Sequence, residues 1–344
     1  MRSRERVIAT IKGEGVDQVP LNPPFQGFWA LGIANISVPL SLKKPKLGAE
    51  AQIKAAERFG FDGLETTGDF LMPPVEALGC EVKQPDVGAG STWTPIINEP
   101  GDLDKLEVPD MRLDHRMMSH TIATEYVLEK VGKERFVQFS TIAPFTLIGD
   151  IRGVETFMLD TLTDPDFVVR MLQFGNEVMK TYVEYMIKLG VDGITLCDPT
   201  ASGSLISPGD FKKYSKPYIK DCAKVIKKHD GCFILHICGD TSDRLDEVLD
   251  TKPDVFSIDY QVDLAVAKKA FGIRSTLLGN VKPAHTLYSG TPDACLKECL
   301  DCIKKGGEIR YILGAGCDIA PGSPEENVMQ MGRAVQMARR ASKK

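Results

Sequence analysis

The regular alternation of short apolar runs with amphipathic helical segments is the feature that most restricts how this chain can fold. Eight runs have the length and the residue types of buried strands, and helical patterns separate most of them. Parallel strands need crossovers of this length, and the helices then cover the sheet. The predicted strands lie at residues 19–22, 62–66, 135–141, 193–197, 232–238, 255–259, 276–280 and 309–313. Eight such units predict a (β/α)8 TIM barrel.

The predicted helices define the boundaries of the domain. They lie at residues 3–13, 48–59, 114–132, 144–151, 154–162, 166–189, 207–228, 242–250, 263–271, 291–305 and 324–341. The segment 22–48 is rich in Pro and Gly and is predicted to be an ordered loop region. No Gly/Ser-rich linker divides the chain, so we expect one domain over residues 1–344, with 1–60 as an N-terminal helical extension. An open doubly wound sheet is the alternative, but a dinucleotide-binding sheet of that kind would carry a GxGxxG turn that this sequence lacks.

Composition excludes several classes of function. The chain has 42 Lys and Arg against 47 Asp and Glu, a net charge of −5, which argues against a nucleic-acid partner. No apolar stretch approaches the ~18 residues that a membrane helix needs. The first helix lacks the apolar core of a signal peptide, so we expect a cytoplasmic protein. Nine cysteines argue against a disulfide framework in such a protein. Four of them fall in helical patterns and are expected to be free thiols: Cys222, Cys295, Cys299 and Cys302.

Three residues form a candidate zinc site. His236 and Cys238 lie two residues apart in the strand-like run LHICGD, so both side chains point to one side of a strand. Cys317 lies in the glycine-rich loop GAGCDIAP, where its backbone can approach another segment closely. One imidazole and two thiolates are zinc ligands, and three protein ligands leave a fourth position open for chemistry. A buried histidine with two unreactive thiols is the alternative interpretation.

Other polar residues end predicted strands, where active sites of such barrels lie. Asp198 is a candidate base or substrate contact, although helix capping or a structural hydrogen bond explains it equally well. Asp259 is a candidate catalytic residue, as a partner of the ligand histidine or as a direct substrate contact. The remaining candidates for substrate binding are Glu65, Asp69 and Asn280. Three further histidines lie in polar helical surroundings and are expected on the surface: His115, His120 and His229.

Four segments together resemble the uroporphyrinogen decarboxylase superfamily over nearly the whole chain. They are RERVIATIKGEGVDQVP, CDPTASGSLISPGDF, LHICGD and GAGCDIAPGSPEENV. Within that superfamily the chain is similar to the zinc-dependent cobamide methyltransferases. The resemblance implies a TIM barrel, Zn²⁺ held by His236, Cys238 and Cys317, and a corrinoid carried by a partner protein. It departs from the coenzyme M enzymes at SIDY, residues 257–260, where a more acidic pair is expected.

The resemblance leaves three functions to compare. The first is a zinc- and corrinoid-dependent methyltransferase, which acts on a thiol such as coenzyme M or on a methylated donor. The second is a porphyrinogen decarboxylase, but the family's arginine-rich substrate segment corresponds here to VPLNPPFQGFWA, which has no arginine between Val19 and Ala30. The third is a non-catalytic metal- or corrinoid-binding module. A homodimer without nucleic-acid or membrane partners is a further expectation.

Overall fold

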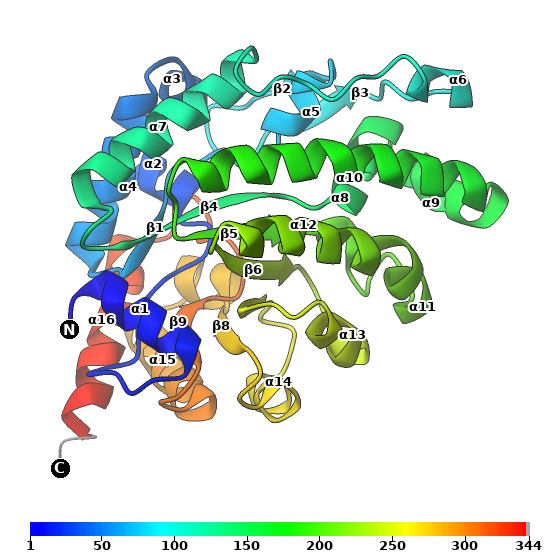
Figure 1. The fold of residues 1–344 in the computed structure, drawn as a ribbon. Helices are drawn as coiled ribbons and strands as arrows, with labels where there is room; N and C mark the ends of the chain where they lie inside the picture. The colour runs from blue at the N-terminus through cyan, green and yellow to red at the C-terminus, as the bar shows by residue number, and fades with distance from the viewer. Residues whose placement is uncertain (342–344) are drawn as a thin grey trace.

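A parallel sheet of seven strands forms the centre of the molecule in a computed structural model that describes residues 1–341. The strands follow one another in chain order around a curled sheet (Figure 1). They are β1 (Gly63–Glu65), β4 (Phe136–Ile142), β5 (Gly193–Cys197), β6 (Cys232–Ile237), β7 (Val255–Ile258), β8 (Thr276–Val281) and β9 (Tyr311–Ala315). A separate antiparallel hairpin consists of β2 (Glu81–Lys83) and β3 (Ser91–Thr94). The α/β class and the parallel sheet were both predicted.

Helices connect and cover the strands (Figure 1). The α-helices are α1 (Ser3–Lys12), α2 (Gly27–Ile33), α3 (Val38–Lys43), α4 (Pro45–Phe59), α5 (Pro73–Ala77), α6 (Pro100–Leu103), α7 (His115–Val131), α8 (Pro144–Arg152), α9 (Val154–Thr163), α10 (Pro165–Lys188), α11 (Pro208–Asp210), α12 (Lys216–Lys228), α13 (Leu245–Asp250), α14 (Leu264–Phe271), α15 (Pro292–Gly306) and α16 (Glu325–Ala341). Short 3₁₀ and π turns are η1 (Pro199–Ala201), η2 (Phe211–Ser215), η3 (Ser242–Arg244) and η4 (Pro283–Tyr288). Among these helices, none has both the length and the apolar character that a membrane crossing requires.

The predicted first strand is reduced to one bridge. Leu21 pairs in parallel with Leu313 of β9, and Asn22 N–H donates to the Leu313 carbonyl at 3.0 Å. On its other side, Leu21 N–H donates to Asp62 Oδ2 at 2.9 Å, and Asp62 N–H donates to the Leu21 carbonyl at 2.6 Å. The neighbouring prolines lack the N–H groups that a longer ladder needs. Residues 20–22 therefore connect the two edge strands of the sheet without forming a full strand.

The Pro- and Gly-rich segment 22–48 contains two helices that the sequence analysis missed. The helix α2 is apolar on all sides, which is typical of a buried helix. Its Trp29 is fully buried and donates from Nε1 to the Ser323 carbonyl at 2.9 Å. The helix α3 begins at the N-cap Ser37, whose hydroxyl accepts from Leu40 N–H. Pro39 and Pro45 lie in the first turns of α3 and α4, where a helix tolerates proline, whereas Pro23 and Pro24 lie in the loop before α2.

The N-terminal helix α1 packs against the end of the sheet at which the strands begin. This end is opposite the carboxyl ends of the strands. Val7 forms one buried cluster with residues from five strands: Phe136, Ile234, Val255, Leu278 and Ile312. A much larger apolar core fills the space between the sheet and the outer helices. The four helical cysteines are buried free thiols in that core, as predicted. Both cores leave the carboxyl ends of the strands available for a site.

We expect Asp62 to be the polar residue on which closure between residues 20–22 and β1 depends. Its carboxylate accepts from Arg6 Nη1 at 2.6 Å and from Leu21 N–H, and both charged side chains are buried. Asp62→Ala leaves Arg6 paired with Asp17 but removes the acceptor of Arg6 Nη1 and of the buried Leu21 N–H, so the free energy of unfolding should fall by about 2–4 kcal/mol. Asp104→Ala removes an exposed partner of Arg170 and should change stability by about 1 kcal/mol or less. Urea denaturation of both variants measures the difference, and equal losses would contradict this role.

Candidate metal centre

His236, Cys238 and Cys317 meet at the carboxyl end of the sheet. His236 is the penultimate residue of β6, Cys238 follows that strand, and Cys317 follows β9 after one glycine. One potential ligand atom from each residue lies within 4.8 Å of the others. His236 Nε2 lies 3.2 Å from Cys238 Sγ, and the two sulfur atoms are 3.8 Å apart. The structure therefore brings together the three residues that the sequence singled out.

Two glycines allow this close approach. Gly239 has φ +81°, a conformation that favours glycine, and it turns the chain away directly after Cys238. Gly316 precedes Cys317, and a Cβ atom there would lie only 2.5 Å from the backbone nitrogen of Tyr260. Any larger residue would push the Cys317 loop away from the loop that follows β7. Local backbone sterics thus fix the position of both sulfur atoms.

The orientation of His236 is set by Ser257 on the neighbouring strand. His236 Nδ1 lies 3.0 Å from the Ser257 carbonyl and 3.1 Å from its hydroxyl. A carbonyl can only accept, so the proton sits on Nδ1 and the lone pair of Nε2 faces the sulfur atoms. Ligand histidines in metal sites make this kind of second hydrogen bond. The sequence analysis assigned that role to Asp259 as one option, and the structure gives it to Ser257.

Electrostatics favour a thiolate at this site. The hydrogen bond from Cys238 lowers the pKa of Cys317 to about 4. Burial opposes this shift, and His236 adds to it. The same hydrogen bond, together with burial, raises the pKa of Cys238. Burial lowers the pKa of His236, but its contacts with Cys317 and Ser257 outweigh burial and raise it overall. The two sulfurs thus share one negative charge, and thiolate is the form that binds metals.

The distances fit a tetrahedral zinc site. With Zn–S bonds of ~2.3 Å, two sulfurs at a tetrahedral angle lie ~3.8 Å apart, and an imidazole nitrogen lies ~3.6 Å from each sulfur. The observed sulfur separation is 3.8 Å, and His236 Nε2 lies 3.2 Å from Cys238 Sγ and within 4.8 Å of Cys317 Sγ. The donor set is also correct, because zinc takes thiolates and neutral imidazole in preference to hard oxygen ligands. These residues can hold Zn²⁺ with small side-chain movements.

Asp259 lies beside this cluster. It is buried, and its carboxylate accepts from Gln261 N–H at 2.9 Å. Burial raises its pKa, hydrogen bonds from the backbone of Gly239 and Gln261 oppose the shift, and the charge of Cys317 adds to it. Asp259 is therefore close enough for the charges of Cys317 and His236 to affect its pKa. Its hydrogen bonds, however, are with backbone N–H groups. A substrate contact by Asp259 stays a prediction.

Asp198 is placed by three hydrogen bonds. Its carboxylate accepts from Thr146 N–H and Oγ1 and from Ser215 Oγ, at 3.1, 2.7 and 2.6 Å. Burial raises its pKa to about 6 against these bonds. The carboxylate ties the loop after β5 to α8 and to η2, which is the structural alternative considered for it. A catalytic role for Asp198 stays a prediction.

Glu65 is fully buried at the end of β1. Oε1 accepts from Gln138 Nε2 at 2.9 Å and from Ser140 Oγ at 2.6 Å. Burial raises the pKa of Glu65 to about 7, although the hydrogen bonds oppose the shift. Glu65 also contributes to the raised pKa of Asp318, the residue after Cys317. The structure therefore places Glu65 on the side of the sheet that faces the metal-ligand loop.

Asn280 contacts protein groups outside the ligand cluster. Its Nδ2 donates to the carbonyls of Asp259 and Val262 at 3.1 and 2.8 Å, and Cys302 of α15 lies against its oxygen. The helix α15 packs on β8 and β9. The amide of Asn280 thus supports the loop after β7 from the helix side, and its predicted role in substrate binding stays untested.

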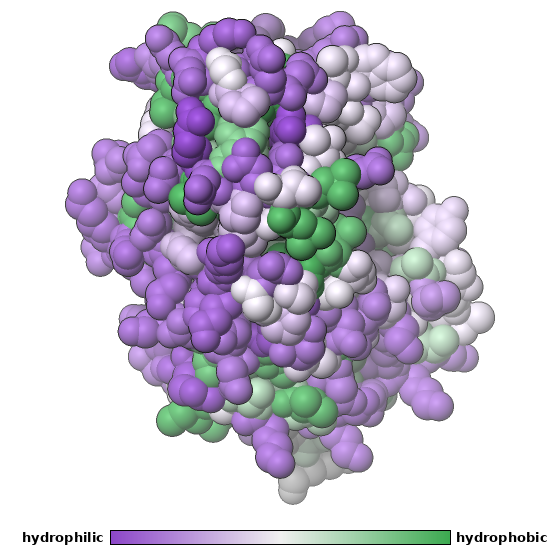
Figure 2. Space-filling model, turned by 90° about the vertical axis from the view of Figure 1, so that its right-hand side faces the viewer, coloured by the Kyte–Doolittle hydropathy of each residue, from purple (hydrophilic) through white to green (hydrophobic). Residues whose placement is uncertain are grey.

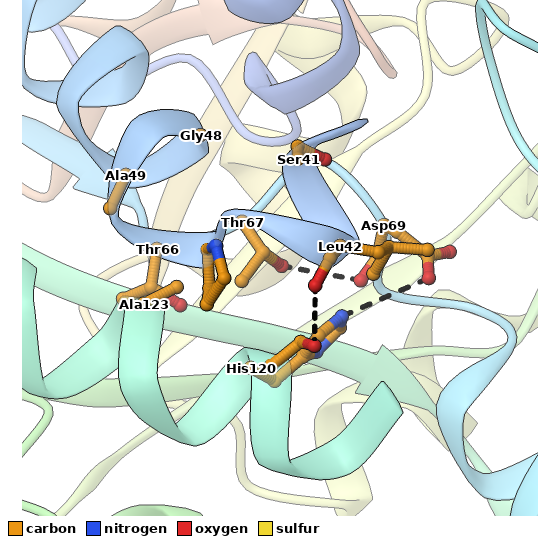
Figure 3. A pocket seen from close by; sticks show the side chains of 12 residues that line it. Ser41, Leu42, Gly48, Ala49, Thr66, Thr67, Asp69, His120 and Ala123 are labelled. Atoms are coloured by element: carbon orange, nitrogen blue, oxygen red, sulfur yellow. Dashed lines mark hydrogen bonds and ion pairs between the residues drawn. The ribbon is translucent and has the colours of Figure 1, made fainter. Parts of the chain in front are cut away.

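Asp69 faces a small cavity between α3, α4 and α7 (Figure 3). Arg116 Nε lies 3.2 Å and His120 Nε2 lies 3.8 Å from its Oδ2. All three side chains are at least 95% buried. The expected surface position of His120 is therefore wrong, because α7 turns this residue under the loop after β1. Asp69 connects the loop after β1 to Arg116 and His120 of α7. The neighbouring Phe70 stacks on Phe25 with ring centres 4.9 Å apart.

Sequence reasoning missed Ser257 and Phe25 as neighbours of the ligands. Phe25 packs edge-on against His236 at 4.9 Å and has a positive φ of 54°, for which the sequence gives no signal. Asp318 Oδ1 is buried without a hydrogen-bond partner, and burial raises its pKa well above the usual range. Ser257 pairs with His236 in the register of β6 and β7, so knowledge of that register would have identified it.

Comparisons with known proteins find similar sequences and structures over most of the chain. The sequence profile of the uroporphyrinogen decarboxylase (URO-D) family matches residues 2–338. The chain is 28% identical to methylcobamide:CoM methyltransferase MtaA from Methanosarcina barkeri, covering 94% of this chain and 95% of the relative. It is 31% identical to methylcobamide:CoM methyltransferase MtbA from Methanosarcina mazei, covering 82% and 83%. A solved structure of a methyltransferase from Methanosarcina mazei superimposes with a TM-score of 0.90 at 27% identity, covering 98% and 99%.

We expect the purified chain to bind one zinc ion through the three ligands. Cys317→Ala should weaken zinc binding by at least about 100-fold, because loss of an outer hydrogen-bond partner alone costs 10- to 100-fold. Cys232→Ala changes a thiol at the opposite end of the strand β6 and is the matched control. Competition with a colorimetric zinc chelator measures both affinities. Equal affinity in the two variants would remove Cys317 from the ligand set.

Glu65 should make stability depend on pH. Its pKa is about 7 in the folded chain against an ordinary value of 4.5, so the folded state holds a proton that the unfolded chain releases between these values. Stability from this group is therefore present at low pH and is lost as pH rises from about 4.5 to 7, by about 2–3 kcal/mol. Glu65→Gln should lack this loss, whereas the exposed Glu81→Gln should keep it. Urea denaturation at pH 5 and pH 8 measures the effect, and parallel pH profiles for wild type and Glu65→Gln would contradict it.

Proposed function

Since this chain belongs to the uroporphyrinogen decarboxylase (URO-D) family and is a methyltransferase, we propose that it moves a methyl group between a corrinoid protein and a small substrate held at a zinc ion. The single observation that carries the proposal is the convergence of His236 Nε2, Cys238 Sγ and Cys317 Sγ within 4.8 Å. A decarboxylase would have no use for that donor set. The small substrate is either a thiol that accepts the methyl group or a methylated compound that donates it.

Zinc would be held by His236, Cys238 and Cys317, with the fourth position open to the substrate. When bound, zinc acts as a Lewis acid that deprotonates a coordinated thiol or polarises a methylated heteroatom. Ser257 keeps His236 in the tautomer that offers Nε2 to the metal. Two thiolates and a neutral imidazole neutralise the charge of Zn²⁺, so a substrate sulfur bound there stays electron-rich.

The surrounding residues organise this site. Phe25 is 2% exposed and shields one side of His236 from water. Asp259 and Glu65 are our candidates for groups that contact the substrate directly. Asp198, Asp69 and Asn280 hold the loops after β5, β1 and β7, and we assign them positioning roles. Exclusion of water strengthens every electrostatic interaction at the reacting atoms.

The corrinoid is proposed to arrive on a partner protein that docks over the carboxyl ends of the strands. Figure 2 views the molecule from the side of Figure 1 on which α9 and α11 lie, and apolar residues gather in the middle of that face. Leu159 and Leu162 of α9 and Leu205 in the loop after η1 are exposed apolar side chains. A corrinoid is too large to enter a closed site beside a small substrate, so an open docking face fits this partner.

Porphyrinogen decarboxylation is the weaker alternative. The segment 19–30 runs beside the metal ligands and contributes Phe25 and Phe28 rather than arginine side chains. A substrate with many carboxylates needs such counter-charges. A non-catalytic corrinoid-binding module is also less consistent, because it needs no open coordination position.

The finer structural expectations complete the proposal. We propose that residues 20–22 take the place of the eighth strand in a closed (β/α)8 barrel, through their hydrogen bonds to β9 and to Asp62. A single domain over 1–344, a homodimer and a cytoplasmic location stay predictions of the sequence.

A direct test uses methylcobalamin in place of the corrinoid protein. Zinc-loaded protein should demethylate methylcobalamin in the presence of a suitable thiol, or methylate cob(I)alamin from a suitable donor, with a visible change in the cobalt spectrum. Cys317→Ala should slow the reaction at least about 100-fold, since Lewis-acid activation contributes several kcal/mol. Cys232→Ala should retain the wild-type rate. No reaction in either direction with any thiol or methyl donor would contradict the proposed function.

A further inference from the structure

We propose that the cavity beneath the loop after β1 binds one internal water molecule, which joins Asp69 of that loop to His120 of α7, and that this polar network positions Phe25 against His236. None of the three candidate metal ligands lines this cavity, and the site does not depend on methyl transfer. Three observations support it: buried polar atoms without partners, the size and lining of the cavity, and packed side chains that lead from the cavity to His236.

Asp69 and His120 carry buried polar atoms that lack hydrogen-bond partners. Each side chain is only 1% exposed. Among the described residues, neither carboxylate oxygen of Asp69 and neither ring nitrogen of His120 has a partner. Leaving such atoms unpaired is unfavourable, and about nine in ten buried polar groups in proteins have a protein or water partner. Four unpaired atoms on two facing side chains therefore indicate a bound molecule between them.

The separation of these two side chains suits a bridging molecule. His120 Nε2 lies 3.8 Å from Asp69 Oδ2, and the two groups face each other in Figure 3. This distance is too long for a direct hydrogen bond, whose heavy atoms lie ~2.7–3.2 Å apart, but one water molecule can lie within that range of both atoms. Arg116 Nε lies 3.2 Å from the same oxygen without making a hydrogen bond. The carboxylate therefore stays available to a bridging water.

The cavity has room for one water molecule. The volume that the centre of a water molecule can occupy is about 10 Å³, and an internal water needs ~10–15 Å³ on this measure and about three polar partners. Asp69 and His120 supply two of them. Thr66 also lines the cavity, and its Oγ1 accepts from Thr124 Oγ1 at 3.0 Å, which leaves the Thr66 hydroxyl proton free to donate. A larger ligand has no space here.

Close contacts on both sides of the cavity oppose its collapse. On the side of α7, Ser119 Oγ donates to the Leu42 carbonyl of α3 at 2.7 Å. On the side of the loop, the backbone of Thr67 lies so close to α2 that a Cβ atom on Gly27 would be 2.4 Å from the Thr67 carbonyl oxygen. A direct bond between His120 and Asp69 would require one of these sides to move. A water molecule satisfies both side chains without such movement.

Packed side chains connect this cavity with His236. Asp69 is followed by Phe70, whose ring stacks on Phe25 with centres 4.9 Å apart. Phe25 packs edge-on against His236 at 4.9 Å. The φ of Phe25 is +54°, a conformation that a bulky residue adopts only where surrounding contacts impose it. A network that fixes Asp69 therefore also fixes the rings beside His236, so Asp69 and His120 are positioning residues for the candidate metal centre.

A high-resolution crystal structure of the full chain tests the water site directly. We expect a separate density peak within about 3.2 Å of an Asp69 carboxylate oxygen and of a His120 ring nitrogen. His120→Leu removes one of the partners and replaces it by an apolar group, so the peak should be lost in that variant. An empty cavity in the wild-type protein, or a direct hydrogen bond between His120 and Asp69, would overturn the inference.

Metal binding tests the positioning role. His120→Leu should weaken zinc binding by about 2- to 30-fold, the range for residues that act on a site through packed side chains. It should also shift the visible absorption bands of the Co²⁺-substituted protein, because these bands depend on ligand geometry. His120→Gln keeps a donor and an acceptor at the cavity and should restore both readouts. His115→Leu makes the same change at the exposed first residue of α7 and should leave both unchanged.

A second substitution keeps the test decisive where His120→Leu does not fold. Ala123→Val enlarges a residue that lines the cavity and takes the space of the water, while Asp69 and His120 keep their side chains. The variant should lose the density peak and weaken zinc binding, whereas Ala123→Ser should retain both. Wild-type zinc affinity and an unchanged cobalt spectrum in a folded variant without the peak would overturn the positioning role. None of these measurements requires methyl transfer, so their outcome is separate from that of the proposed function.

Discussion

The curl of the parallel sheet is the constraint on which the metal centre depends. The strands β6 and β9 are separated by β7 and β8, so in a flat sheet they would lie ~14 Å apart. The sulfur atoms of Cys238 and Cys317 are nevertheless 3.8 Å apart, although 79 residues separate them along the chain. Only a sheet that bends back on itself can bring these strand ends together. The bonds of residues 20–22 to β9 and to Asp62 maintain that bend from the other side, so a polar contact far from the sulfurs helps to hold the ligand geometry.

The sequence was sufficient for features with a local cause. Strand and helix positions followed from apolar periodicity, and the His-x-Cys pair followed from the two-residue repeat of a strand, so both were predictable. The features it missed depend on contacts between distant segments. Ser257 orients His236 only through the register of β6 with β7, and Asp69 is turned to Arg116 and His120 only because α7 packs over its loop. The helices α2 and α3 were missed because prolines and glycines indicated a loop, whereas tertiary burial of Trp29 stabilises a helix there.

Buried carboxyl groups connect the stability of this fold with its chemistry. Burial raises the pKa of Glu65 to about 7 and that of Asp198 to about 6, and it also raises that of Asp259. Each such shift means that the folded state disfavours the charged form, which reduces stability near neutral pH. For Asp198, hydrogen bonds to the carboxylate partly offset the cost of burying its charge, and they connect three segments of the chain. Glu65 and Asp259 lie near the ligand cluster. Groups with shifted pKa values are found preferentially at functional sites.

The same fold serves different reactions in this family because the chemistry lies in the loops at one end of the sheet. In this chain a zinc-type donor set comes from the ends of β6 and β9, and the segment before β1 presents aromatic rings to it. The aromatic rings in that segment favour apolar groups next to His236, and the strands themselves need not change for the segment to vary. The metal-ligand residues and their aromatic surroundings thus come from separate segments, so the surroundings can change without loss of the donor set.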